Sequence, residues 1–529
     1  MITYEQLWAA DPDSWRTTGA AWRDADAVVG RRSAEITATA AALRTQWSGT
    51  AGRTADARLA GIRDQLDAGR PAYVAVDQVL AEFAAAIVRA KAMLQGAVDA
   101  ADLVRVLVDR RGEVTVDPAL TPPNGPTLAA AHRIACEIRA ALDLATSADR
   151  EAADRLGALS TAAAADWVAR PPACHPPAGA DPVAVRRWWD GLSPAEQRWL
   201  IRHEPALIGP LDGVPVRDRD QANRLVLDEQ RATLLGRRAD LLARRPVRYG
   251  ELDHVDGLLA GVDAITARLT SATVPRAYLL RLGSGGDGRA IVALGNPDQA
   301  ENVLTYVPGM TADLASVDGE LGRASRMAAR CAELGPAERT ATVLWLDYDA
   351  PDFVDEAMHA SHAHDAGPAL HRFHEGLRAS HDGPPAHQTV LGHSYGSLVV
   401  GATARDHGLA ADSLVFVGSP GVGVDRAADL RMPPGQVWSS TAGNDVIQYA
   451  TAPPAAVLKQ AALAVTAPLI GPLLAIAAPD EELWFGRNPV DPDFGARVFD
   501  GAPRGHTGYW DAGNPALDGM ARVALGPPA

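Results

Sequence analysis

A Gly-x-Ser-x-Gly pentapeptide, residues 392–396, constrains the fold of this chain more than any other feature. It lies between an apolar stretch typical of a strand, 389–391, and one typical of a helix, 398–400. A strand-to-helix turn this tight leaves no room for side chains on either side of its serine, which explains both glycines. The sequence therefore predicts that Ser394 stands on a strained turn as a nucleophile. The alternative is a small serine at a glycine-rich helix start.

From residue 278 onward, short apolar runs alternate with helical or loop stretches, which is the pattern of a doubly wound sheet. The expected strands are residues 278–282, 290–294, 302–307, 340–345, 388–392, 413–417, 436–441 and 496–500. Eight strands are what an α/β-hydrolase sheet needs. We therefore expect residues 181–529 to form an α/β-hydrolase domain with a doubly wound, mostly parallel sheet and a helical prelude over 181–275.

A serine nucleophile needs a histidine base, which in this fold follows the last strand. Only His407 and His506 follow Ser394, and His407 falls in or at the end of the helix after the turn, pointing away from the strand ends. His506 is therefore the predicted base. Asp445, after the seventh strand, is the favoured acid because serine, acid and base then fall on successive connections. Asp425, after the sixth strand, is the alternative.

Acyl transfer also needs two backbone N–H groups aimed at the oxygen that becomes negative. The N–H of Tyr395, directly after the serine, is one of them by geometry. The second is expected from the loop after the third strand, 307–311, where Gly309 permits a sharp turn and either Gly309 or Met310 donates. An ordinary Pro-Gly turn is the alternative.

Several motifs in order resemble a largely uncharacterised family of actinobacterial α/β-hydrolases that are often fused behind helical hairpins. The motifs lie at residues 188–192, 211–215, 296–298, 302–309, 345–351, 392–397, 417–423 and 444–445. The resemblance covers about residues 182–525 and implies Ser394, Asp445 and His506 as a catalytic triad. The family usually has Pro-Gly-Thr-Gly after the third strand, whereas this chain has Pro-Gly-Met-Thr at 308–311.

The first 110 residues predict a long antiparallel helical hairpin, so the chain as a whole should begin with an all-α region. A helix start at Asp11-Pro12 is followed by apolar residues at every seventh position: Trp15, Trp22, Val29, Ile36 and Leu43. Residues 46–49 interrupt the pattern, and a second stripe follows at Leu59, Leu66, Tyr73, Leu80, Ile87 and Leu94. We expect these stripes to bury each other, with Trp47 packed in the turn and a kink at Pro71.

The tripeptide Trp47-Ser48-Gly49 at this turn resembles the Trp-x-Gly hairpin proteins of actinobacterial type VII secretion. That resemblance implies a helical protein partner for residues 1–110 and export by a type VII-like route. A cytoplasmic location is the alternative, and we expect no signal peptide of the general secretory pathway. Tyr73 and Asp77 fit the spacing of the family's Tyr-xxx-Asp/Glu element, although Tyr73 is favoured as a seam residue.

Residues 111–180 are expected to connect the two regions. A turn-rich stretch over 111–126 precedes a helix over 127–165, and 166–180 carries four prolines and reads as a linker. Helix starts at Asp181-Pro182 and at the capping box of Ser193 and Glu196 then open the C-terminal domain.

Three patterns argue against other classes of function. The net charge of −15 repels phosphate backbones, so we expect no nucleic-acid partner. Residues 283–288 match a dinucleotide motif, but a strand follows them, so a hairpin turn is expected and no cofactor. The histidines at 359, 362, 364, 371 and 374 have no paired cysteines nearby, so we expect a solvated helix–loop face and no metal.

Residues 460–479 carry no charge and are long enough to span a bilayer. Prolines interrupt them, however, and they fall between the predicted acid and the last strand. We expect an apolar cap beside Ser394, with core packing as the alternative, and no stable membrane span. The sequence as a whole predicts an esterase or lipase-like serine hydrolase for a small ester or lipid-like substrate. The second hypothesis is a type VII effector or interaction protein that carries the hydrolase domain as cargo.

Overall fold

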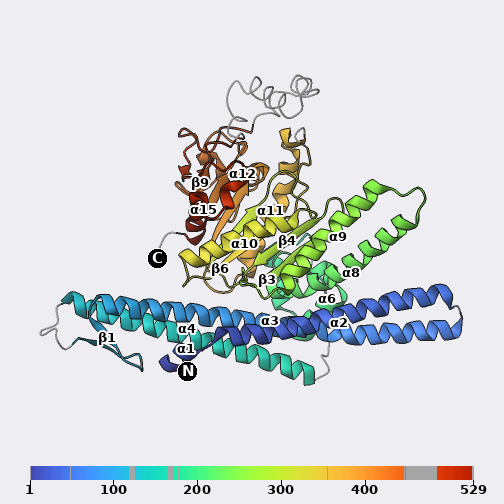
Figure 1. The fold of residues 1–529 in the computed structure, drawn as a ribbon, viewed down its shortest axis with the longest axis horizontal. Helices are drawn as coiled ribbons and strands as arrows, with labels where there is room; N and C mark the ends of the chain where they lie inside the picture. Colours follow the sequence, from blue (N-terminus) through green and yellow to red (C-terminus); the bar gives the residue numbers. More distant parts are fainter. Residues whose placement is uncertain are drawn as a thin grey trace. The chain divides into compact units, whose positions relative to one another are not determined.

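The structure is a computed structural model that describes residues 2–47, 49–117, 125–164, 172–176, 179–353, 356–445, 447 and 485–526. Contacts divide the chain into two compact units (Figure 1). The first consists mainly of Met1–Arg170, and the second contains most of the remaining chain.

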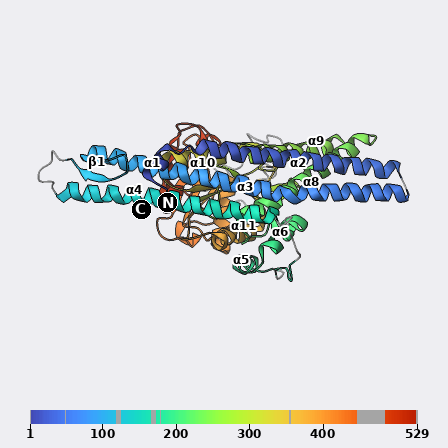
Figure 2. The same cartoon turned by 90° about the horizontal axis from the view of Figure 1, so that it is seen from below.

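The N-terminal unit is built on the predicted pair of long helices. A short α1 (Tyr4–Ala9) precedes α2 (Pro12–Gln46) and α3 (Thr50–Leu103), which run side by side (Figure 2). Asp11 caps α2 by accepting a hydrogen bond from the Asp13 N–H, and Pro12 opens the helix. The helix α3 continues through Pro71 without interruption.

The two predicted stripes meet at Trp15 and Phe83 and at Trp22 and Tyr73, but the most buried part of the seam between α2 and α3 contains charge pairs that were not predicted. The buried positions of α2 lie beside the apolar stripe, four residues after its members or, for Arg23, directly after Trp22: Gly19, Arg23, Asp26, Ser33 and Ala40. Arg23 pairs with Asp77 at 2.5 Å, and Asp26 pairs with Arg70 at 2.8 Å. The apolar stripe flanks this seam, which leaves Trp22 37% exposed and in contact with Tyr73.

The apolar core of this unit lies elsewhere, where α3 meets α1 and α4 (Gly125–Ala164). Its members include Leu7, Ile87, Leu94, Ile134 and Ile138. A third long helix therefore buries the apolar half of α3. By length and composition alone, Ala51–Leu103 contains a stretch that could cross a membrane, but core helices meet the same test and 44% of that stretch is buried.

Strand structure that the sequence did not indicate follows α3, partly in the expected hairpin region 1–110 and partly in the expected connector. Strands β1 (Val106–Val108) and β2 (Val114–Val116) pair as an antiparallel hairpin, so the N-terminal region is not entirely helical. The proline-rich linker at 166–180 falls largely outside the described residues.

The C-terminal unit opens with helices whose predicted starts are confirmed. Asp181 accepts a hydrogen bond from the Ala184 N–H, and Ser193 and Glu196 form the expected capping box. The helices are α5 (Pro182–Asp190), α6 (Pro194–His203), α7 (Pro205–Ile208), α8 (Val216–Ala243) and α9 (Tyr249–Thr270).

An eight-stranded sheet forms the centre of this unit, and all eight predicted strands are confirmed with ends shifted by at most two residues. The strands are β3 (Ala277–Gly283), β4 (Arg289–Leu294), β5 (Asn302–Val307), β6 (Thr340–Leu346), β7 (His387–His393), β8 (Ser413–Val417), β9 (Val437–Ser440) and β10 (Arg497–Val498). Their order is β10-β9-β8-β7-β5-β6-β4-β3. Only β4 runs antiparallel to its neighbours β3 and β6, and the other pairs are parallel.

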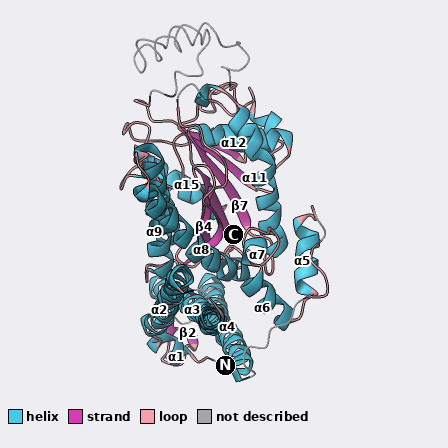
Figure 3. Cartoon of the chain, turned by 90° about the vertical axis from the view of Figure 1, so that its right-hand side faces the viewer, coloured by secondary structure: helices cyan, strands magenta, loops and turns pink. Residues whose placement is uncertain are grey.

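Helices cover both faces of the sheet, as the expected α/β-hydrolase fold requires (Figure 3). One core contains α9, α10 (Val317–Leu334) and α15 (Pro515–Leu525), and the other contains α11 (Ser361–Ser380) and α12 (Tyr395–Asp406). Short 3₁₀ turns are η1 (Glu356–Met358), η2 (Ala427–Leu430) and η4 (Gly508–Trp510). Residues 283–288 form the turn of the β3–β4 hairpin, as predicted.

Candidate active site

The serine pentapeptide forms a sharp turn between β7 and α12. Ser394 has φ 55° and ψ −129°, a backbone conformation that is costly for a residue with a side chain. A Cβ on Gly392 would come within 2.5 Å of the Ser397 Cα, and one on Gly396 within 2.3 Å of the Val307 carbonyl oxygen. Both glycines are therefore required by close backbone packing around the serine.

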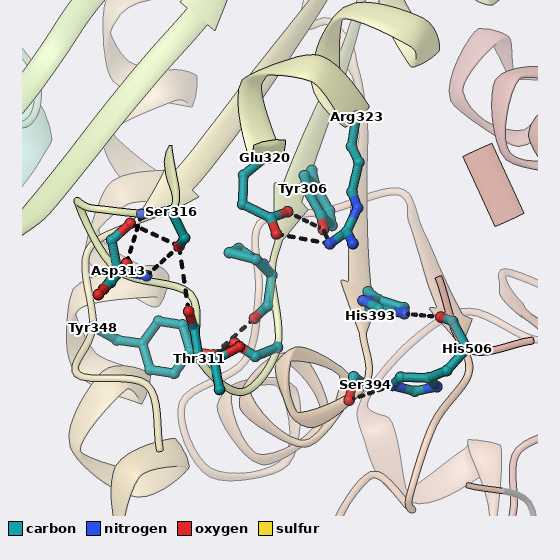
Figure 4. A network of polar contacts seen from close by, with 12 residues as sticks. Tyr306, Thr311, Asp313, Ser316, Glu320, Arg323, Tyr348, His393, Ser394 and His506 are labelled. Atoms are coloured by element: carbon teal, nitrogen blue, oxygen red, sulfur yellow. Dashed lines mark hydrogen bonds and ion pairs between the residues drawn. The ribbon is translucent and has the colours of Figure 1, made fainter. Parts of the chain in front are cut away.

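Three residues from three different loops meet at the ends of the parallel strands. Ser394 follows β7, Asp445 follows β9 and His506 follows β10. The Ser394 Oγ lies 2.8 Å from the His506 Nε2 (Figure 4). The His506 Nδ1 lies 2.9 Å from the Asp445 Oδ2. Because a carboxylate can only accept, Nδ1–H donates to Asp445 and Nε2 is left to accept from the serine hydroxyl. The structure thus brings together three of the predicted site residues.

The carboxyl group of Asp445 is held in its charged form. Burial opposes its ionisation, but hydrogen bonds from His506 and from the Tyr509 hydroxyl outweigh burial and lower its pKa below the ordinary value. Tyr509 donates to Oδ2 at 2.6 Å, and the Ile447 N–H donates to Oδ1 at 3.0 Å. Asp425, the alternative acid, accepts instead from the Arg487 N–H at 3.0 Å and is not in this cluster.

The loop after β5 packs directly against the nucleophile. A Cβ on Gly309 would lie 2.6 Å from the Ser394 Cβ, so only glycine fits at this position. Tyr395 opens α12, and N–H groups of a first helical turn have no partner within their helix. The main chain of Gly309 and the N–H of Tyr395 therefore flank the serine, and Met310, which is half-buried, follows Gly309.

Two tyrosines that sequence reasoning missed support these groups. The Tyr348 hydroxyl donates to the Pro308 carbonyl at 2.7 Å and so fixes the loop that precedes Met310. Tyr509 supports Asp445 and accepts from the Ala442 N–H at 2.9 Å. Nothing local in the sequence marks either tyrosine, although Tyr348 lies within the 345–351 motif and Tyr509 lies three residues after the base.

The expected solvated histidine face is wrong for one member of the set. His374 is fully buried on α11, its Nδ1 lies 2.9 Å from the Gln388 Oε1, and burial lowers its pKa to about 4. His371 is half-buried and contacts the Gly408 carbonyl. Within the described part of the chain, no group of three or more His, Cys, Asp or Glu side chains is arranged to hold a metal ion.

The C-terminal unit has two surface hollows that none of the three clustered residues lines. One of about 510 Å³ is bounded by α8 and α9, and one of about 650 Å³ by α10 and α15. Ser394 lines neither of them. The predicted apolar cap at 460–479 lies outside the described residues.

Comparison with known proteins identifies relatives of the C-terminal unit. A family model described as alpha/beta hydrolase matches residues 284–456, a range that contains Ser394 and Asp445 but ends before His506. The uncharacterized protein Rv2079 of Mycobacterium tuberculosis is 31% identical over 384 residues, which are 66% of this chain and 56% of that protein. The chain therefore spans about half the length of that relative.

Two further matches are shorter. The uncharacterized protein Rv0963c of Mycobacterium tuberculosis is 34% identical over 214 residues, which are 39% of this chain and 78% of that protein. The crystal structure of esterase PE8 covers 43% of this chain and 94% of its own, with 17% identity and a TM-score of 0.26.

Proposed function

The chain belongs to the same family as the uncharacterized protein Rv0963c, and its residues 284–456 match an alpha/beta hydrolase model; from that premise we propose that it is a serine hydrolase of carboxylic esters. The observation that carries the proposal is the continuous hydrogen-bonded series from the Ser394 hydroxyl through His506 to Asp445. A serine beside a histidine that a carboxylate orients is the arrangement that activates a hydroxyl for acyl transfer.

The proposed reaction begins when the Ser394 Oγ attacks the carbonyl carbon of the ester. His506 Nε2 takes the hydroxyl proton as the new C–O bond forms, and Asp445 stabilises the resulting imidazolium. The tetrahedral oxyanion lies between the N–H of Tyr395 and the N–H of Gly309 or Met310. When the ester C–O bond breaks, His506 returns the proton to the departing alkoxide, and an acyl group stays on Ser394.

Water completes the cycle by the same route. His506 accepts a proton from a water molecule as the water oxygen attacks the acyl carbon. The C–Oγ bond then breaks, the proton passes to the Ser394 Oγ, and a carboxylic acid is released. A small ester or a lipid-like ester satisfies this chemistry, and an esterase and a lipase differ only in what surrounds the acyl group.

Covalent labelling tests the proposal directly. The purified full chain is treated with a fluorophosphonate and digested, and the modified peptide is mapped. We expect modification at Ser394, none in Ser394→Ala, and hydrolysis of p-nitrophenyl esters by the wild type alone. A folded wild-type protein that neither reacts with the reagent nor cleaves esters would show that the hydroxyl is not activated.

We also propose that the helical unit binds a helical protein partner and directs export by a type VII-like route. The observation that favours this second role is Trp47, which is 48% exposed at the α2–α3 turn instead of packed in it. An exposed indole is common at protein interfaces. The test is fractionation of a mycobacterial host that expresses the full chain: wild type should reach the medium and Trp47→Ala should not. Retention of both in the cells would exclude the route.

A further inference from the structure

We propose that His393, the residue before the nucleophile, is a positioning residue that holds the base His506 through its backbone carbonyl. The inference rests on the proposed function, because it assigns a supporting role in the same reaction. His393 ends β7, and its side chain is buried. The motif requires only glycines and serine around this position, so the histidine is free to have a role of its own.

The contact between the two histidines has one chemical interpretation. The His393 Nε2 lies 2.9 Å from the carbonyl oxygen of His506. A carbonyl only accepts, so the His393 Nε2 carries the proton and donates it. The two rings also pack at 4.8 Å between centroids with 33° between their planes. His506 is therefore held at its backbone as well as at its Nδ1.

His393 remains neutral over the range in which a serine hydrolase works. Burial, the charge of His506 and that of Arg323 lower the pKa of His393 to about 3. A neutral ring keeps its Nε2–H as a fixed donor and adds no charge beside His506. Since His506 becomes positive during the reaction, a charged neighbour would oppose that step.

His393 packs against a buried polar and aromatic cluster, of which Figure 4 shows Tyr306, Glu320 and Arg323. Its ring meets the Trp510 ring edge to face at 4.8 Å, and Arg323 lies 4.9 Å above that indole. Arg323 pairs with Glu320 at 2.7 Å, and Glu320 accepts from the Tyr306 hydroxyl at 2.6 Å. Side chains from β5, α10 and η4 therefore hold the ring of His393, which carries the donating Nε2–H, in place.

His506 is thus hydrogen-bonded to two consecutive residues, to His393 through its carbonyl and to Ser394 through its Nε2. Ser394 and His393 are adjacent in the chain, so the peptide unit that places the Oγ also places the donor to His506. The peptide between His393 and Ser394 and the hydrogen bond from His393 Nε2 to the His506 carbonyl together link the nucleophile to the base. Without that bond, the loop after β10 can shift relative to the elbow, and a displacement of about 1 Å costs roughly 100-fold in rate.

Three variants separate positioning from packing. His393→Leu fills the site but cannot donate, and His393→Gln places an amide donor near the original Nε2. His374→Leu is the matched control, because His374 is also fully buried but its partner Gln388 lies at the opposite end of β7. We expect kcat to fall by about 100-fold in His393→Leu with little change in KM. His393→Gln should recover most of the loss, and His374→Leu should keep its kcat.

A second readout does not depend on turnover. In the wild type, the Nδ1 proton of His506 should give a downfield proton NMR resonance because it is held between ring and carboxylate. We expect this resonance to be absent in His393→Leu and present in His393→Gln. If the wild type shows the resonance but cleaves no ester, the proposed function fails, and the resonance in the two His393 variants still decides whether His393 holds His506 in place. If His393→Leu keeps both the resonance and its kcat, or a folded His393→Gln recovers neither, the positioning role is overturned.

Discussion

The candidate site depends on which side chain orients His506. Both Asp445 and Asp425 follow late strands in the chain, and the sequence allowed either one. In the structure, Asp445 is buried, accepts from His506 and Tyr509, and has a lowered pKa, whereas Asp425 binds a main-chain N–H elsewhere. Asp445 is therefore the residue that we expect to orient His506.

Exchanging each acid for its amide tests this assignment. In Asp445→Asn, the amide cannot orient the Nδ1–H tautomer in the same way, so we expect kcat for ester hydrolysis to fall by about 10³ to 10⁴-fold. Asp425→Asn is the matched control and should stay within about threefold of wild type. A larger loss in Asp425→Asn, with both proteins folded, would reverse the assignment.

At the scale of elements, the helical hairpin contains two buried charge pairs beside its apolar contacts. The pair of Arg23 and Asp77 is almost fully buried, as is the pair of Arg70 and Asp26. Removing one partner of a buried pair leaves the other charge without compensation. Both pairs join α2 to α3.

A substitution at this seam should therefore loosen the hairpin. We expect Asp77→Ala to destabilise α2 and α3 by about 3 to 5 kcal/mol, measured by hydrogen exchange of these helices in the full chain. Asp64→Ala is the control, because its pair with Arg63 is solvent-exposed, and we expect a change below about 1 kcal/mol. Equal protection in both variants would mean that the seam adds no stability.

A substitution in the turn of the hairpin is expected to have little effect on its stability. Trp47 is 48% exposed, so Trp47→Ala removes less contact than the loss of a buried indole, which costs about 3 to 5 kcal/mol. We expect a change below about 1 kcal/mol in the stability of the hairpin, again by hydrogen exchange. A loss of several kcal/mol would mean that the indole is packed in solution.

Across the whole molecule, buried titratable groups act in opposite directions on stability. Burial raises the pKa of Asp298 to about 7 and that of Asp347 to about 6. It lowers the pKa of His374 to about 4. The native aspartates bind protons more tightly than the unfolded chain, so their effect is a loss of stability as the pH rises from about 4 to 7. The buried histidine instead lowers stability as the pH falls below about 6.5.

These effects on the free energy of unfolding partly cancel in the wild type. Comparing the wild type with a variant that lacks one of the groups isolates the effect of that group. Asp298→Asn removes the aspartate that becomes charged in its buried site near the start of α8. Relative to wild type, we expect the variant to gain about 3 kcal/mol in unfolding free energy between pH 5 and pH 8. Thermal denaturation at both pH values measures this change. A constant difference between the proteins would mean that Asp298 does not titrate in this range.

The sequence alone determined those features that depend on neighbours along the chain. The eight strands, the caps at Asp181 and Ser193, and the elbow around Ser394 follow from local periodicity, capping and glycine spacing, which residues a few positions apart decide. The order of the candidate nucleophile, acid and base along the chain was equally accessible, because each comes after a recognisable strand.

Only the tertiary structure decided which distant side chains meet. It placed Asp445 instead of Asp425 beside His506, buried His374, and put charge pairs in a seam for which the heptad pattern predicted apolar residues. It also brought His393, Tyr348 and Tyr509 to the site. These outcomes depend on how strands and helices are turned about their axes when they pack. A side chain's partner across the fold leaves no periodic signal in the sequence around it.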